Sequence, residues 1–188
     1  MFAKLRNFIL WLTTPIQKLL QNWSRPEPEM SREQVDKLLS VIQKGDLLLS
    51  YEGGRLTSPF IRGDWDHLAV VCDKNKAIEA VAPKVRFCDL EEWLFKKKGV
   101  AVIRYTGLKS VRIKAAGFVH KYAGWPYDYL FTYTNKKAYC SEIGFLSYRE
   151  FDPQFMNHLK KREVLPQDFY DAAQTRVSKL VVIGEVRN

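Results

Sequence analysis

The residue with the clearest chemical potential in this sequence is Cys140. It follows a polar loop, residues 134–137, and precedes an apolar-periodic segment, residues 139–148, that we expect to be helical. A thiol at a helix N-terminus lies at the positive end of the helix dipole, which favours the thiolate. The thiolate is the nucleophile in covalent catalysis, so the position indicates nucleophilic chemistry. The alternative is a small, buried, inert thiol.

A thiol nucleophile also needs an imidazole, and the chain has three histidines. His120 lies in a helical stretch and His158 in a charged one, so both are interpreted as surface residues. His67 differs because it begins an apolar strand directly after a polar loop. A site at the edge of a sheet would present a side chain at such a position. His67 is therefore the candidate base, with a strand-edge histidine as the alternative.

The remaining motifs limit the chemistry. Cys72 ends an apolar strand and Cys88 precedes the helix cap Asp89, so both are expected to be structural thiols. An odd number of cysteines favours a reducing compartment. The sequence has no glycine-rich phosphate loop, no paired-cysteine metal spacing, no His-Glu-x-x-His and no Gly-x-Ser-x-Gly. We therefore expect neither a metal nor another cofactor.

The elements that must position these residues alternate between strands and helices. Strands are expected at residues 46–51, 67–72, 77–82, 100–105 and 180–186, and helices at 31–44, 89–98, 110–122, 139–148 and 166–177. The second and third strands are separated by a short turn and should form a β-hairpin. Few β-α-β units are present. The pattern predicts an α+β fold with an antiparallel sheet or small barrel packed against helices.

The length of the hairpin loop decides which side chains share a face. A two- or four-residue loop pairs Val70 with Glu79 and sends Glu79 to the face opposite His67. An odd loop pairs Ala69 with Glu79 and keeps Glu79 on the face of His67. We predict the odd loop or a bulge.

The N-terminal residues form a separate basic segment. Residues 1–23 have apolar side chains at helical spacing, and residues 24–29 read as a proline-rich linker. We expect residues 1–29 to be this amphipathic segment and its linker, and residues 30–188 to be the folded domain. The segment could lie on an anionic membrane surface through Lys4, Arg6 and Lys18, or pack on protein. No run of about 18 apolar residues is present, so a transmembrane protein is not expected. The cysteine count and the poor match of residues 1–23 to a secretory signal predict a cytoplasmic protein, peripheral to a membrane if the segment binds one.

Several short patches resemble the permuted papain-like cysteine hydrolases of the NlpC type, in the YiiX/YebB-like branch. They are Gly45–Leu49, Asp66–Val71, Ala77–Ala80, Gly124–Asp128 and Tyr139–Glu142. The histidine patch precedes the cysteine patch, which is the order of the permuted branch. The resemblance covers roughly residues 45–150.

This resemblance implies a role for each candidate residue. Cys140 would be the nucleophile, His67 the general base, and Glu79 the third member that orients the imidazole. Tyr127 would contact the substrate or stabilise the oxyanion, with a core aromatic as the alternative. Glu142 is interpreted as a solvent-facing acid on the first turn of the helix and is left out of the triad. The substrate would be a peptide, an amide or a lipid ester, by hydrolysis or acyl transfer.

A second class of function is an idle basic binding module. The chain has 30 Lys and Arg against 21 Asp and Glu, a net charge of +9, which favours anionic partners. Such a module would serve a membrane surface or nucleic acid. No nucleic-acid motif is present, so nucleic acid is not expected as a partner of the enzyme.

Overall fold

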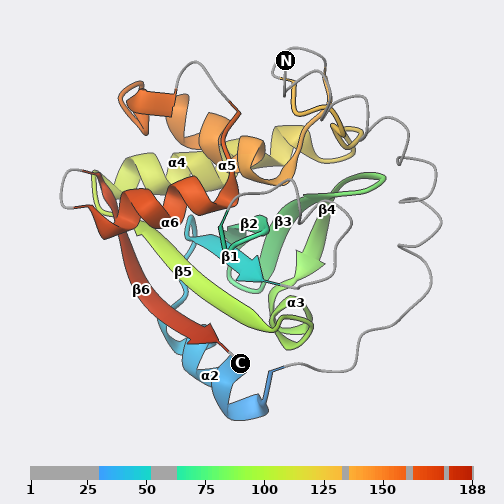
Figure 1. Ribbon diagram of the computed structural model, residues 1–188, viewed down its shortest axis with the longest axis vertical. Helices are drawn as coiled ribbons and strands as arrows, with labels where there is room; N and C mark the ends of the chain where they lie inside the picture. The colour runs from blue at the N-terminus through green and yellow to red at the C-terminus, as the bar shows by residue number, and fades with distance from the viewer. Residues whose placement is uncertain (1–29, 52–62, 133–135, 160–162, 176–177, 188) are drawn as a thin grey trace.

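A six-stranded antiparallel sheet forms the centre of the protein (Figure 1). The computed structural model describes residues 30–51, 63–132, 136–159, 163–175 and 178–187. The strands are β1 (Leu47–Tyr51), β2 (His67–Asp73), β3 (Lys76–Val81), β4 (Lys84–Asp89), β5 (Gly99–Tyr105) and β6 (Leu180–Arg187). Their order is β4-β3-β2-β1-β5-β6, so the sheet is open, with β4 and β6 at its edges. The expected α+β class is confirmed.

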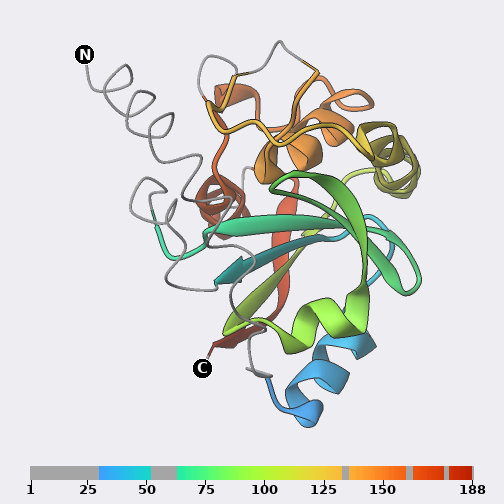
Figure 2. The same cartoon turned by 90° about the vertical axis from the view of Figure 1, so that its right-hand side faces the viewer.

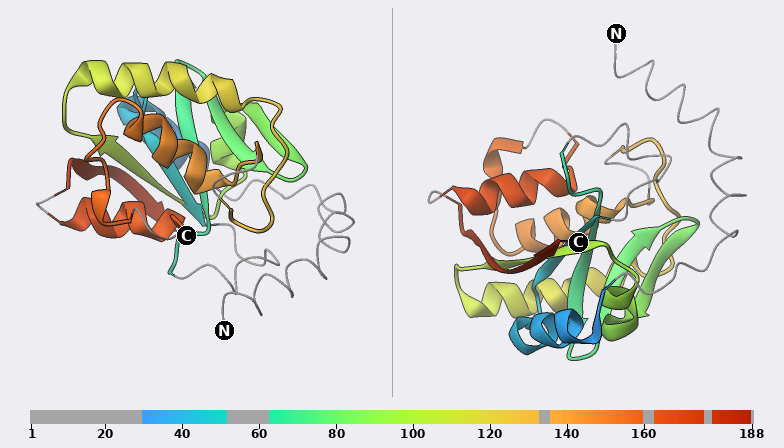
Figure 3. Two further views of the ribbon diagram at one scale, coloured as in Figure 1. Left: turned by 90° about the horizontal axis from the view of Figure 1, so that it is seen from above. Right: turned by 60° about the horizontal axis from the view of Figure 1, so that its bottom comes forward.

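Helices cover both faces of the sheet. They are α2 (Arg32–Val41), α3 (Leu90–Phe95), α4 (Lys109–Phe118), α5 (Cys140–Arg149) and α6 (Pro166–Gln174), with short 3₁₀ turns η2 (Val119–Tyr122) and η3 (Asn157–Leu159). One core joins one face of the sheet to α4, α5 and α6, and the other joins the opposite face to α2 and α3. Figure 2 and Figure 3 show these layers. None of the described helices is long and apolar enough to cross a membrane.

The β2–β3 hairpin has the register that the odd loop predicts. Ala69 pairs with Glu79 and Val70 with Ile78, and the register shifts between Val71 and Asp73. This irregularity leaves Cys72 as an extra residue, which is the signature of a β-bulge. Glu79 therefore shares the face of Ala69 and His67. The predicted register, in which a bulge pairs Ala69 with Glu79 and so allows Glu79 to reach His67, is confirmed.

Two helix starts follow the capping residues seen in the sequence. Ser31 Oγ accepts from Gln34 N at 3.3 Å, and Gln34 Oε1 accepts from Ser31 N at 2.8 Å. Asp89 Oδ1 accepts from Glu92 N at 3.0 Å. These side chains satisfy N–H groups that the first helical turn leaves unbonded, and they fix where α2 and α3 begin.

Some boundaries differ from the prediction. Strand β4 was not predicted, because its alternate residues Lys84 and Arg86 obscure the apolar period and it is an edge strand. Gly99 was expected to end a helix, but α3 ends at Phe95 and Gly99 begins β5. Residues 1–29 lie outside the described residues, so the amphipathic segment and its linker stay predictions.

Candidate active site

His67 and Glu79 form a buried pair on adjacent strands. His67 Nε2 lies 2.8 Å from Glu79 Oε2, and the two side chains are only 1% and 3% exposed. His67 is the first residue of β2, so the pair lies at the end of that strand. The confirmed hairpin register is what brings the two residues to the same face. This contact is the one that the sequence resemblance implied.

Three further donors surround the carboxylate of Glu79. Trp93 Nε1 donates to Oε2 at 2.9 Å, and Arg86 donates to Oε1 from Nε at 3.1 Å and from Nη2 at 3.0 Å. Burial opposes ionisation, but the hydrogen bond and charge of His67, the charge of Lys97 and the Trp93 hydrogen bond hold the pKa of Glu79 well below its usual range. Glu79 is therefore a carboxylate.

The ionised state of Glu79 determines the tautomer of His67. A carboxylate can only accept hydrogen bonds, so the nitrogen facing it, Nε2, must carry the proton. In the neutral imidazole the lone pair then lies on Nδ1. A base that removes a thiol proton needs such a lone pair, and the pairing supplies it on the nitrogen that faces away from Glu79.

Helix α5 carries Cys140 to the same end of the sheet. The Tyr148 hydroxyl, at the far end of α5, donates to the carbonyl oxygen of Gly45, just before β1. At mid-helix, a Cβ on Gly144 would lie 3.0 Å from Leu68 Cδ2, so the glycine allows close approach to β2. Cys140 is one turn beyond Gly144, on the same side of the helix. The helix therefore runs against β2, and its N-terminus approaches the strand end where His67 lies.

The side chain of Cys140 and those of the His67–Glu79 pair lie on opposite faces of the sheet. Cys140 is 3% exposed and belongs to the core on the α5 side of the sheet. Strand alternation places His67 and Glu79 with Ala69 on the other side, where the His67 ring lies 6.4 Å from the ring of Trp93. The structure thus brings His67 and Glu79 into contact and places Cys140 at the same end of the sheet.

Tyr127 lies in a loop that is tied to the residues just before Cys140. Asp128 N donates to Ala138 O at 3.0 Å, Ala138 N donates to Pro126 O at 3.0 Å, and Tyr127 N donates to Pro83 O at 2.9 Å. The phenol ring is half-buried and lies 5.0 Å from the ring of Tyr129. Tyr127 is therefore held beside the start of α5 without being a fully buried core residue.

Glu142 was expected to face solvent, and that interpretation is wrong. Its side chain is 2% exposed, and Oε2 accepts from Tyr139 N at 3.3 Å. Burial raises the pKa of Glu142 to about 8; the Tyr139 hydrogen bond lowers it and the nearby charge of Asp128 raises it. The available signal was composition: Ser141, Gly144 and Ser147 are small residues in a helix that is buried on nearly every side.

We expect Glu142→Gln to become increasingly stabilising from about pH 5 to about pH 8. In this range the unfolded wild-type chain releases the Glu142 proton, whereas the folded protein retains it because its pKa is about 8. Wild-type stability therefore falls by up to about 1.4 kcal/mol per pH unit, and glutamine has no proton to release. Urea unfolding of both proteins across this range measures the effect. A difference in stability that does not change with pH would contradict the prediction.

The other two thiols have structural surroundings. Cys72 Sγ donates to Lys76 O at 3.4 Å and Cys88 Sγ to Ala77 O at 3.5 Å. Burial raises the pKa of both thiols. His120 is exposed, as expected, and the side chain of His158 lies outside the described residues.

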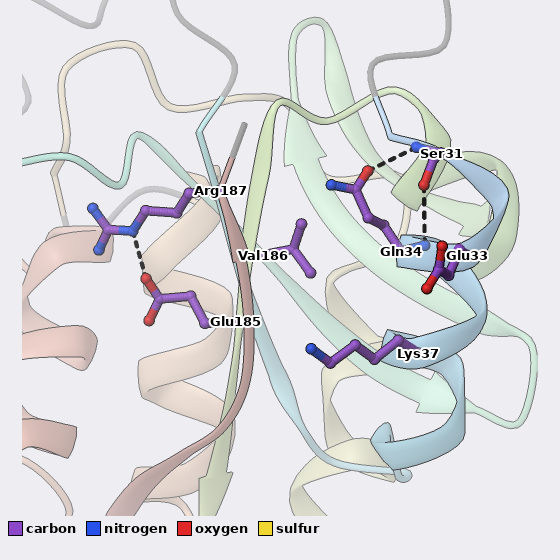
Figure 4. A pocket seen from close by; sticks show the side chains of 7 residues that line it. All are labelled: Ser31, Glu33, Gln34, Lys37, Glu185, Val186 and Arg187. Atoms are coloured by element: carbon purple, nitrogen blue, oxygen red, sulfur yellow. Dashed lines mark hydrogen bonds and ion pairs between the residues drawn. The ribbon is translucent and has the colours of Figure 1, made fainter.

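An open groove between α2 and β6 contains none of the predicted site residues. Figure 4 shows its lining, which is Ser31, Glu33, Gln34, Lys37, Glu185, Val186 and Arg187. Two pairs in this lining bond to each other, Ser31 with Gln34 and Glu185 with Arg187. The groove brings no nucleophile next to a base, so the candidate active site is the region around Cys140, His67 and Glu79.

Comparisons with known proteins point to one family. A family model described as "Permuted papain-like amidase enzyme, YaeF/YiiX, C92 family" matches residues 41–180. The uncharacterised protein YiiX of Escherichia coli K12 is 32% identical over 151 residues, which is 62% of this chain and 74% of that protein. A crystal structure of YiiX from Escherichia coli O157:H7 matches with a TM-score of 0.60 at 21% identity, covering 78% of this chain and 98% of that one.

The Escherichia coli O157:H7 structure is described as that of a metalloprotein. Among the residues that the structure of the present chain describes, no group of three or more His, Cys, Asp or Glu side chains is placed to hold a metal ion. The described residues therefore supply no ligand set of three or more such side chains.

Proposed function

This chain belongs to the permuted papain-like amidase family, as its sequence patches indicated, and on that premise we propose that it is a cysteine hydrolase acting through Cys140, His67 and Glu79. The observation that supports the proposal most is the buried His67–Glu79 pair, at the strand end that the N-terminus of α5 approaches. The proposed substrate is an amide or an ester, which includes peptides and lipid esters.

The proposed reaction begins with proton transfer. His67 Nδ1 takes the proton of the Cys140 thiol, and the thiolate attacks the carbonyl carbon of the substrate. The developing oxyanion is stabilised by the backbone N–H of Cys140 at the start of α5. The imidazolium then gives its proton to the leaving amine or alcohol, and a thioester remains on Cys140.

The second half of the reaction releases the acyl group. His67 removes a proton from water, or from another acceptor in acyl transfer, and the resulting nucleophile attacks the thioester. The thiolate leaves and takes back the proton from His67, which regenerates the enzyme. Glu79 keeps the imidazole oriented through both halves because its bond is to Nε2, which carries a proton throughout. The proposed role of Tyr127, whose loop is hydrogen-bonded to the chain just before Cys140, is to contact the substrate or to stabilise the oxyanion.

Trapping the thioester tests this proposal. The full chain is mixed with p-nitrophenyl esters and N-acyl p-nitroanilides of short and long acyl chains, quenched in acid and mapped by mass spectrometry. We expect the acyl mass on the peptide that contains Cys140, with release of nitrophenol or nitroaniline, and neither in His67→Ala. Equal acylation of Cys72 and Cys88 would indicate unspecific thiol chemistry. No acylation with any member of the panel would favour the idle binding module.

A further inference from the structure

The buried side of the His67–Glu79 pair contains a cation that the proposed reaction does not use. Lys97 follows α3 and is 5% exposed, although lysine is rarely buried. Its Nζ lies 4.4 Å from the centroid of the Trp93 ring, and the same indole donates through Nε1 to Glu79 Oε2. The lysine is thus placed behind the tryptophan that holds the carboxylate.

The groups with charge or a titratable proton around Glu79 come from three elements. They are His67 from β2, Arg86 and Cys88 from β4, and Lys97 after α3. The charge of Lys97 favours the ionised form of Glu79, as do the bonds from His67 and Trp93. The Arg86 side chain is 58% exposed, so water screens its charge. Lys97 is the buried cation of the set.

A second cation matters because His67 changes charge during the proposed reaction. When His67 is protonated, Glu79 has a positive partner in direct contact. When His67 is neutral, a buried carboxylate supported only by neutral donors tends to take up a proton. A protonated Glu79 would donate to Nε2 and leave the proton of the imidazole on Nδ1. That tautomer has no lone pair for the thiol proton.

We propose that Lys97 is a positioning residue that, through Trp93 and with help from Arg86, keeps Glu79 ionised while His67 is neutral, and so keeps the lone pair of His67 on Nδ1. The inference rests on the proposed role of His67 as the base. It assigns to Lys97 no contact with the substrate. Lys97 acts through charge, not through packing of its aliphatic stem.

Two substitutions at Lys97 separate charge from packing. Lys97→Met keeps an unbranched side chain and removes the charge, whereas Lys97→Arg keeps the charge and changes the shape. Removing a nearby positive charge favours the protonated imidazole. The apparent pKa of the His67–Glu79 pair should therefore rise by about one unit in Lys97→Met and stay within about 0.3 units of wild type in Lys97→Arg. Arg86→Gln should raise it by a smaller amount because Arg86 is exposed.

Nuclear magnetic resonance of the full chain labelled with ¹⁵N-histidine measures both quantities. Titration gives the pKa, the ¹⁵N shifts give the tautomer, and His67→Gln assigns the signals among the three histidines. We expect the Nε2–H tautomer in wild type and in Lys97→Arg, and its partial loss in Lys97→Met. An unchanged pKa in Lys97→Met, or an equal shift in Lys97→Arg, would overturn the inference.

Two further outcomes keep the test decisive. If Lys97→Met does not fold, Arg86→Gln must still raise the pKa of the pair, and an unchanged value there overturns the inference. The measurement needs no turnover, so it is separate from the test of the proposed function. Suppose that no thioester is trapped on Cys140, but the pKa of the His67–Glu79 pair shifts in the variants as expected. The hydrolase proposal is then refuted, and the role of Lys97 at Glu79 stands.

Discussion

Cys140→Ala should abolish hydrolysis while leaving the protein folded. A nucleophile and its base act as a unit, so the rate of the best substrate found with the ester and amide panel should fall by at least about 10³-fold. His67→Ala and the double variant Cys140→Ala/His67→Ala should fall by a similar factor, because once one member is lost the other contributes little. Steady-state kinetics of the three variants measure these losses.

Cys72→Ala is the matched control for this prediction. Cys72 is also a buried thiol, at 1% exposure, and lies in β2 with His67. Both alanine variants remove one buried sulfur and should lower stability by a similar amount, about 1 kcal/mol. Only the variant at position 140 should lose activity. Comparable activity in Cys140→Ala and Cys72→Ala would remove Cys140 from the reaction.

Glu79→Ala should destabilise the protein by about 3–5 kcal/mol. Removing one partner of a buried charged pair leaves the others without compensation, and here His67 and Trp93 lose an acceptor while Lys97 loses a nearby negative charge. Urea unfolding at neutral pH measures the change. Arg86→Ala removes an exposed partner of the same carboxylate and should cost only about 0–1 kcal/mol.

The contribution of Glu79 to the stability of the fold should depend on pH in a defined direction. The pKa of Glu79 is lower in the folded protein than in the unfolded chain, so its ionisation stabilises the fold above the unfolded pKa of about 4.3. That stabilisation is lost as the pH falls through the folded pKa. The stability difference between wild type and Glu79→Gln should therefore shrink in acid. A difference of less than about 1 kcal/mol between wild type and Glu79→Ala at neutral pH would show that the carboxylate is not held as described.

The parts of this site that could be predicted from the sequence depend on short-range signals. Ser31 and Asp89 cap helices through residues three positions away, and the register of the hairpin follows from a loop of a few residues. The pairing of His67 with Glu79 is of this kind, because both belong to one hairpin. The family resemblance supplied the roles of Cys140 and Tyr127, which lie far along the chain from that hairpin.

The parts that could not be predicted depend on how the helices pack. The helix containing Trp93 was expected, but a capping signal does not say which side chain turns toward the sheet. Lys97 is the middle one of three consecutive lysines, a pattern typical of an exposed segment, yet it is buried just before β5 and lies over the Trp93 ring. Glu142 was misplaced because its burial comes from neighbours outside its own helix.

The hairpin also determines when the site can be assembled. His67 and Glu79 are 12 positions apart, whereas Cys140 follows them only after β4, α3, β5 and α4. Proteins are synthesised from the N-terminus and begin to fold as they emerge from the ribosome. The base and its orienting acid can therefore pair on a nascent chain before the nucleophile has been made. In a papain-like chain of the unpermuted order the thiol emerges first. In the permuted order, the reactive sulfur emerges only after the strands that carry its base and the orienting acid. The thiol is therefore never exposed on a nascent chain that still lacks its base.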